Sequence, residues 1–147
     1  MPFCFGPLTY ITCIFPEGFE NEKLITETLP GDQVLTKKGP KTVALVKKGQ
    51  NVKKMYAYKT KTCDLRLTDT HAVALSGQDV IANLSPRNLP ICGKRQDFDV
   101  ILAKDDPLAV VVDDPDDVVY HLGIEDPEKM LLILANGVWA ESLGTFD

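Results

Sequence analysis

Short apolar runs rich in Val, Ile, Leu, Thr and Tyr recur along the whole chain, and clusters of Gly, Pro, Asn and Asp separate them. No long stretch repeats its apolar residues at helical spacing, and at most a turn or two of helix is expected around 78–84. Short strands with frequent turn signals are typical of an all-β sandwich or barrel. The pattern predicts an all-β fold with strands at 9–15, 32–38, 41–49, 53–60, 63–68, 71–75, 99–103, 108–113, 118–124, 130–136 and 137–142.

Turn signals separate these runs, and Asn136-Gly137 is the strongest of them because both residues tolerate the positive φ of a tight hairpin turn. Four lysines flank the turn signal at 49–51, which predicts a solvated hairpin tip there rather than a binding patch. The further signals are 30–32, 39–40, 49–51 and 114–117, and the lysines are Lys47, Lys48, Lys53 and Lys54.

One predicted strand region, "LRLTDTHAVAL" at 65–75, contains an unusual polar interruption. Thr68, Asp69, Thr70 and His71 follow one another, although a half-buried strand alternates polar and apolar residues. The interruption is either an ordinary loop between two strands or a chemical site at a strand end.

Length and charge narrow the class of protein. The 147 residues are enough for one domain, spanning 1–147, with a substantial buried core. A net charge of −5 gives no support for nucleic acid or an anionic membrane as a partner. No apolar stretch approaches the ~20 residues of a membrane span, and the N-terminus lacks the features of a signal peptide. We therefore expect a soluble, cytoplasmic monomer.

The four cysteines lie at wide and irregular spacing, at positions 4, 13, 63 and 92. The chain has no CxxC pair, which argues against structural zinc, and its size argues against a disulfide framework. Cys13, Cys63 and Cys92 are expected in the core. The acidic turn at 113–117 lacks the spacing of a calcium loop. We therefore expect neither a metal site nor a cofactor.

Four segments form an ordered pattern along the chain. Cys4 is followed after five residues by Thr9, "LPGDQVLT" spans 29–36, Thr68 and His71 form a T-x-x-H arrangement, and 118–142 contains Ala-Asn-Gly-Val. Each segment alone is weak evidence for a family. Together and in this order they resemble the Hint family, the module shared by hedgehog autoprocessing domains and inteins. This resemblance covers about 4–142 and implies a compact, horseshoe-like all-β fold and a self-processing activity.

Elementary chemistry is compatible with that activity. A cysteine can attack the carbonyl of the residue before it and convert an amide into a thioester by an N-to-S acyl shift. Because this step is uphill, the site must polarise the amide and protonate its departing nitrogen. A histidine can supply that proton near neutral pH, and a threonine hydroxyl can orient the amide or hold the developing oxyanion.

The resemblance assigns these roles to particular residues. It implies that Cys4 is the nucleophile and that Thr68 and His71 activate the Phe3–Cys4 bond. His121 stands where many inteins have an aspartate that assists catalysis. The implied partner is the chain's own flanking polypeptide on the N-terminal side of Cys4.

The sequence also departs from the intein pattern. Splicing inteins end in His-Asn, and the matching positions here are Glu141 and Ser142, so we expect cysteine-dependent N-terminal cleavage without splicing. Only three residues precede Cys4, so the chain either releases a tripeptide or belongs to a longer precursor. Two alternatives stay open: a degenerate Hint-fold module without chemistry, and a cysteine hydrolase that acts on a separate substrate.

Overall fold

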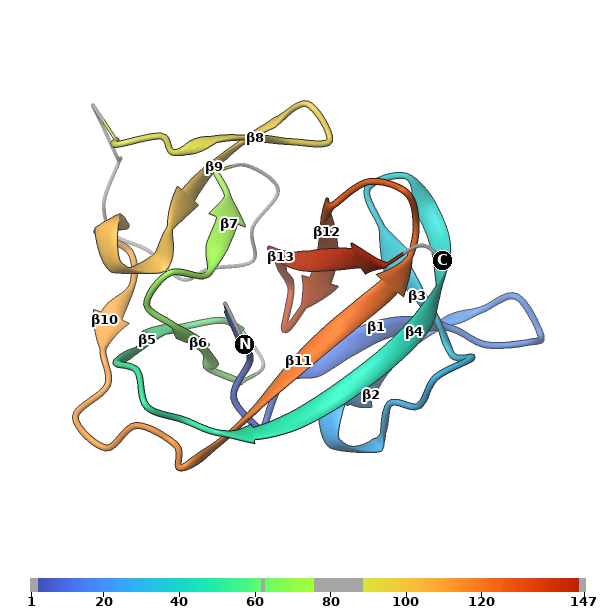
Figure 1. Cartoon of the computed structure of the whole chain (residues 1–147), viewed down its shortest axis with the longest axis horizontal. Helices are drawn as coiled ribbons and strands as arrows, with labels where there is room; N and C mark the ends of the chain where they lie inside the picture. Colours follow the sequence, from blue (N-terminus) through green and yellow to red (C-terminus); the bar gives the residue numbers. More distant parts are fainter. Residues whose placement is uncertain (1–2, 62, 76–88, 146–147) are drawn as a thin grey trace.

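The computed structural model describes residues 3–61, 63–75 and 89–145, and it confirms the all-β prediction (Figure 1). Two single-turn 3-10 helices, η1 (Ile25–Glu27) and η2 (Ala103–Asp105), accompany the strands. The strands are β1 (Tyr10–Ile14), β2 (Glu20–Leu24), β3 (Gln33–Thr36), β4 (Gly39–Gln50), β5 (Met55–Tyr58), β6 (Leu65–Thr68), β7 (Ala72–Ala74), β8 (Gly93–Arg95), β9 (Phe98–Leu102), β10 (Val110–Val111), β11 (Val118–Glu125), β12 (Met130–Ala135) and β13 (Val138–Thr145).

The described strands form two sheets. The larger sheet has the order β2-β1-β12-β3-β4-β11-β13-β7-β9-β8, and the smaller one has the order β10-β5-β6. Additional pairings join β1 to β3 and β12 to β13, so the larger sheet folds back on itself. The long strands β4 and β11 pair antiparallel and curve along one side of the molecule (Figure 1). β12 is a nearly continuous apolar run because it is buried on both faces.

Two strands were not predicted from the sequence. β2 and β8 lie at the two edges of the larger sheet and consist largely of polar or charged residues. An edge strand with little buried surface carries no apolar alternation, so the sequence pattern gives no signal for it. The predicted helical turn at 78–84 lies outside the residues that the structure describes.

Two predicted turns were wrong. The turn predicted at Gly39-Pro40 lies two residues earlier, at Lys37-Lys38, because Gly39 already begins β4 opposite Thr36. Gly49 and Gln50 continue β4 opposite β11, and β5 belongs to the other sheet, so the predicted hairpin tip does not exist. Lys47 and Lys48 therefore lie within the β4–β11 ladder. The Asn136-Gly137 hairpin is confirmed, with φ angles of 48° and 78°.

Cysteine burial differs from the expectation at two positions. All four cysteines are free, and Cys13 is buried as predicted, but Cys63 is half-buried and Cys92 is exposed. Cys92 directly precedes the edge strand β8, where little of the chain packs over it. The described residues contain no helix with the length and apolarity that a bilayer crossing requires.

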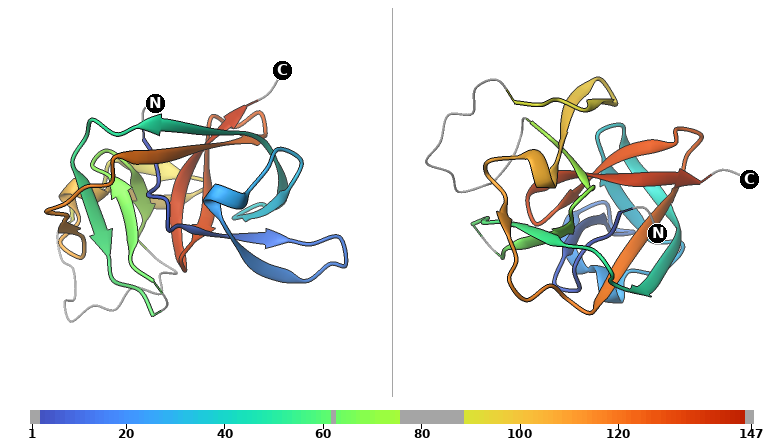
Figure 2. Two further views of the ribbon diagram at one scale, coloured as in Figure 1. Left: turned by 90° about the horizontal axis from the view of Figure 1, so that it is seen from below. Right: turned by 60° about the vertical axis from the view of Figure 1, so that its left-hand side comes forward.

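The N-terminal segment connects the two sheets. Phe5 exchanges backbone hydrogen bonds with Tyr120 of β11, both at 2.8 Å, and Gly6 N donates to Arg66 O of β6 at 2.9 Å. The segment from Phe3 onward therefore runs between β6 and β11, where the dark-blue trace lies in Figure 2. Phe5 is almost fully buried and belongs to the main hydrophobic core. Cys4 is fixed in the same place because its neighbour is clamped on both sides.

Candidate functional site

The Phe3–Cys4 peptide bond lies in the interior, with Phe3 5% and Cys4 3% exposed. The structure brings Thr68 and His121 into contact with this bond and His71 into contact with the next carbonyl group, that of Cys4. Thr68 ends β6, His71 directly precedes β7, and His121 lies in the middle of β11. The turn at 69–70, between Thr68 and His71, lets both side chains contact the backbone of Cys4.

Thr68 contacts the nitrogen of the Phe3–Cys4 bond. Its Oγ1 accepts a hydrogen bond from the Cys4 N–H at 2.8 Å, and its own backbone N–H donates to the Cys4 carbonyl oxygen at 3.1 Å. Thr68 is almost fully buried, so no water competes for these contacts. A hydroxyl group is thus fixed at the atom that an acyl shift would turn into an amine.

His121 contacts the other side of the same bond. Its Nδ1 lies 3.2 Å from the Phe3 carbonyl oxygen, and because that oxygen only accepts, Nδ1 is the donor. Burial lowers the pKa of His121, the hydrogen bond to Phe3 opposes this effect, and Lys47, opposite His121 in the β4–β11 ladder, also lowers the pKa. A donor in this position can stabilise negative charge on the carbonyl oxygen.

His71 contacts a group one residue further along the chain than expected, the carbonyl group of Cys4 instead of the Phe3–Cys4 bond. Its Nδ1 is 3.1 Å from the carbonyl oxygen of Cys4, so Thr68, and not His71, contacts the nitrogen of the bond. Its Nε2 is 2.6 Å from the carbonyl oxygen of Glu141 in β13. The imidazole therefore joins the N-terminal segment to β13 and fixes the Cys4 carbonyl in place.

The protonation state of His71 is set by two opposing effects. Both ring nitrogens face carbonyl oxygens, which only accept, so the protonated ring would satisfy both contacts. Complete burial acts in the other direction and is the larger effect, lowering the pKa of His71 to about 4. The ring is therefore neutral near pH 7, and one of its two carbonyl partners then has no donor from it.

We expect His71 to make the folded state sensitive to mild acid. Its pKa is lowered from 6.5 to about 4 on folding, so the unfolded chain binds the extra proton first as the pH falls. The linked loss of unfolding free energy between these two pKa values is roughly 3 kcal/mol. Urea unfolding across this range should show a steeper pH dependence for the wild type than for His71→Gln. Equal slopes in the two proteins would contradict the assignment.

The thiol of Cys4 lies in an apolar cluster with Met55 and Val119, and Val112 packs against it. Burial raises the pKa of this thiol, and the charge of Lys53 opposes the increase. The sulfur is therefore protonated near neutral pH. Any attack by Cys4 must transfer the thiol proton during the reaction rather than start from a standing thiolate.

Comparisons with known proteins give a result at the level of structure only. No protein-family model matches this sequence, and no curated protein sequence is detectably similar to it. The gp41-1 intein superimposes with a TM-score of 0.55 at 16% identity, over 95% of this chain and 98% of that chain. A DnaB intein from Synechocystis sp. PCC 6803 superimposes with a TM-score of 0.58 at 14% identity, over 95% of this chain and 98% of that chain. This chain has the Hint fold.

A third structure agrees with this result. A bacterial intein-like domain from Clostridium thermocellum has a TM-score of 0.50 at 14% identity, over 94% of this chain and 95% of that chain. The Hint fold predicted from the sequence is thus confirmed over nearly the whole chain. At such low identity the likeness carries the fold alone, and it assigns no role to Cys4, Thr68, His71 or His121.

Glu141 and Ser142, the positions that the sequence analysis matched to the His-Asn ending of inteins, have structural contacts in this Hint fold. The carboxylate of Glu141 is buried and pairs with Arg95 of β8, while Ser142 Oγ donates to the carbonyl oxygen of Leu122. The sequence analysis missed Arg95. A glutamate inside the apolar run of β13 was the available signal, since a buried carboxylate needs a cationic partner.

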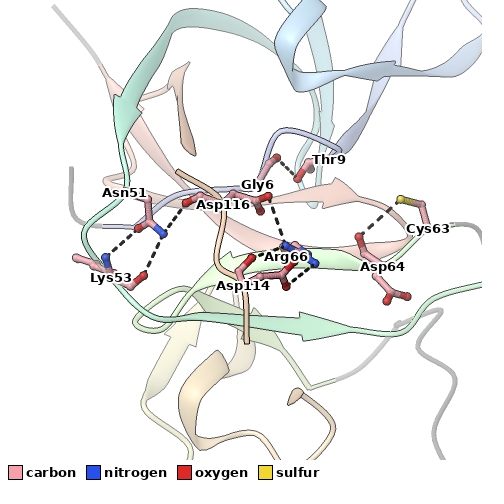
Figure 3. A network of polar contacts seen from close by, with 9 residues as sticks. All are labelled: Gly6, Thr9, Asn51, Lys53, Cys63, Asp64, Arg66, Asp114 and Asp116. Atoms are coloured by element: carbon pink, nitrogen blue, oxygen red, sulfur yellow. Dashed lines mark hydrogen bonds and ion pairs between the residues drawn. The ribbon is translucent and has the colours of Figure 1, made fainter. Parts of the chain in front are cut away.

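A polar network supports the segment beside Cys4 in this fold (Figure 3). Arg66 of β6 lies 3.4 Å from Asp116 and 3.6 Å from Asp114, and Asn51 donates to the Asp116 carbonyl oxygen at 3.0 Å. A Cβ on Gly6 would lie 3.0 Å from the Asp116 carboxylate, so this close approach favours glycine. The acidic turn before β11 is thus tied to β6, next to the N-terminal segment.

None of these groups suggests a metal centre. Within 3–61, 63–75 and 89–145, no set of three or more His, Cys, Asp and Glu side chains is arranged to hold a metal ion.

Proposed function

We propose that this chain is a self-processing domain that converts its Phe3–Cys4 amide into a thioester, whose cleavage by a second nucleophile releases the polypeptide on the N-terminal side. One observation carries the proposal: both polar atoms of this buried bond have a dedicated side-chain contact. His121 Nδ1 lies 3.2 Å from the Phe3 oxygen, and Thr68 Oγ1 lies 2.8 Å from the Cys4 nitrogen. An ordinary buried peptide bond uses backbone partners instead.

In the proposed reaction, Cys4 Sγ attacks the carbonyl carbon of Phe3. The C–S bond forms, the C–N bond breaks, and the thiol proton ends on the Cys4 nitrogen, which becomes a free amine. Negative charge that develops on the Phe3 oxygen is stabilised by the N–H of His121. The Thr68 hydroxyl keeps the Cys4 nitrogen oriented. His71 holds the Cys4 carbonyl, so the backbone of Cys4 stays in place while the C–N bond breaks.

The C-terminal half of an intein reaction is not part of the proposal. Neither Glu141 nor Ser142 can cyclise as the terminal asparagine of an intein does, and both side chains already have protein partners. The thioester would therefore be resolved by water, a thiol or an amine, in one turnover per chain.

The experiment is a fusion of a longer partner ahead of Phe3, incubated with and without dithiothreitol. We expect the thiol to accelerate release and to leave a partner that ends in a Phe3 thioester. Hydroxylamine should leave a hydroxamate at the same residue, which mass spectrometry distinguishes. A fusion that stays intact under all three conditions would contradict the proposal.

A degenerate Hint-fold module without chemistry is the second candidate. The apolar surroundings of the Cys4 thiol and the structural pairing of Glu141 with Arg95 favour it. An intact fusion that unfolds cooperatively in urea would support this candidate, because it would show a folded but unreactive domain.

A further inference from the structure

The side chain of Phe3, the residue before the scissile bond, is enclosed by the two histidines of the site. Its ring centroid lies 4.8 Å from that of His71, tilted by 54°, and 5.8 Å from that of His121, in an edge arrangement at 63°. Only 5% of Phe3 is exposed. These are the only two histidines in the chain, so both imidazoles are used at this one position.

Phe3 is also held through its backbone. His121 contacts the Phe3 carbonyl oxygen with Nδ1, and its ring lies edge-to-face with the Phe3 ring. His71 is enclosed from a second side by Phe5, with ring centroids 4.4 Å apart at 65°. Tilted and edge-to-face pairs at these separations are the favourable arrangements for aromatic rings.

We propose that His71 and His121 form a subsite that selects an aromatic residue immediately before the scissile bond. This inference rests on the proposed function and names the class of substrate that the same site accepts. His121, which contacts the Phe3 carbonyl oxygen, and His71, which contacts the Cys4 carbonyl oxygen, also form the walls around the Phe3 side chain. An aromatic ring therefore orients both of them, whereas a small side chain leaves them unpacked and hydrated.

The subsite has a clear order of preference on physical grounds. A tyrosine keeps the ring, a leucine keeps apolar volume without the aromatic edge contacts, and an alanine loses both. An aspartate would place a carboxylate in an interior position without a cationic partner from the site. Loss of orientation at the peptide group reduces the rate of reaction even where the fold is retained.

The test is a set of fusions that differ only at this position: Phe3→Tyr, Phe3→Leu, Phe3→Ala and Phe3→Asp. We expect release in dithiothreitol at a similar rate for Phe and Tyr, and about 10- to 100-fold slower release for Ala, with Leu in between and Asp slowest. Phe19→Ala is the matched control, since Phe19 is 51% exposed and stacks on Phe15 away from the site. It should leave the rate unchanged.

A second measurement separates this inference from the proposed function. The imidazole signals of the two histidines in an NMR spectrum should both shift in Phe3→Ala and stay in place in Phe19→Ala, whether or not the chain reacts. If the Phe3 fusion does not cleave at all, the proposed function fails, and unshifted signals would then overturn the subsite as well. If the Phe3 fusion cleaves and Ala or Leu cleaves equally fast, aromatic selection is wrong.

Discussion

Cys4→Ala should abolish thiol-induced release of an N-terminal partner, with a rate at least about a thousand-fold below that of the wild type. Alanine has no nucleophile, and the Phe3–Cys4 amide has no second thiol in its apolar cluster, which otherwise consists of Met55, Val119 and Val112. The measurement is the fraction of intact fusion over time, by gel and mass spectrometry, in the presence of dithiothreitol.

Cys13→Ala is the matched control for this prediction. Cys4 and Cys13 are both 3% exposed, and Cys13 lies in β1 with its thiol donating to the Ile11 carbonyl oxygen. Each substitution removes one buried sulfur, so each should cost a similar amount of stability. Only the first should stop the release. Undiminished release from Cys4→Ala would show that another group attacks the bond.

His121→Leu should slow the release by roughly 100- to 1000-fold, the usual cost of removing one donor to a developing oxyanion. Leucine fills a similar space but has no N–H to offer the Phe3 carbonyl oxygen, which now accepts from Nδ1 at 3.2 Å. His121→Asn is the matched variant, because its amide nitrogen can occupy a place near that of Nδ1. It should retain a larger part of the rate than the leucine variant.

The measurement is single-turnover release from the two fusions at several pH values, together with urea unfolding of each protein. Equal rates for Leu and wild type would remove His121 from the mechanism. Equal rates for Leu and Asn, both far below wild type, would contradict the donor role and point to the imidazole itself as the required group.

The local features of this protein could be predicted from the sequence, and the features made by tertiary contacts could not. Thr68 and His71 are three residues apart, and the Asn136-Gly137 turn is encoded by its own two residues, so a sequence pattern contains them. Arg95 meets Glu141 across 46 positions, and no local pattern records that pair. The polar strands β2 and β8 were missed for a related reason, because hydrogen bonding to one neighbour places them in the sheet.

The chemistry at the Phe3–Cys4 bond shows the same limit. Cys4, Thr68, His71 and His121 were predicted together from the sequence. Which histidine nitrogen faces which oxygen, however, depends on how β6, β11 and β13 approach one another. The burial of Phe3 was not expected either. A residue so near the start of the chain shows no alternation with its neighbours, and its packing is provided by side chains about 70 and 120 positions away.

The clamping of the N-terminal segment between β6 and β11 has a consequence for the order of events during synthesis. Cys4 leaves the ribosome more than a hundred residues ahead of His121. Contacts between such distant positions form late in folding because a long loop must close before they form. The bond thus gains its complete set of polar partners only after β11 has been made, so under the proposed reaction a half-synthesised chain would keep its flank attached.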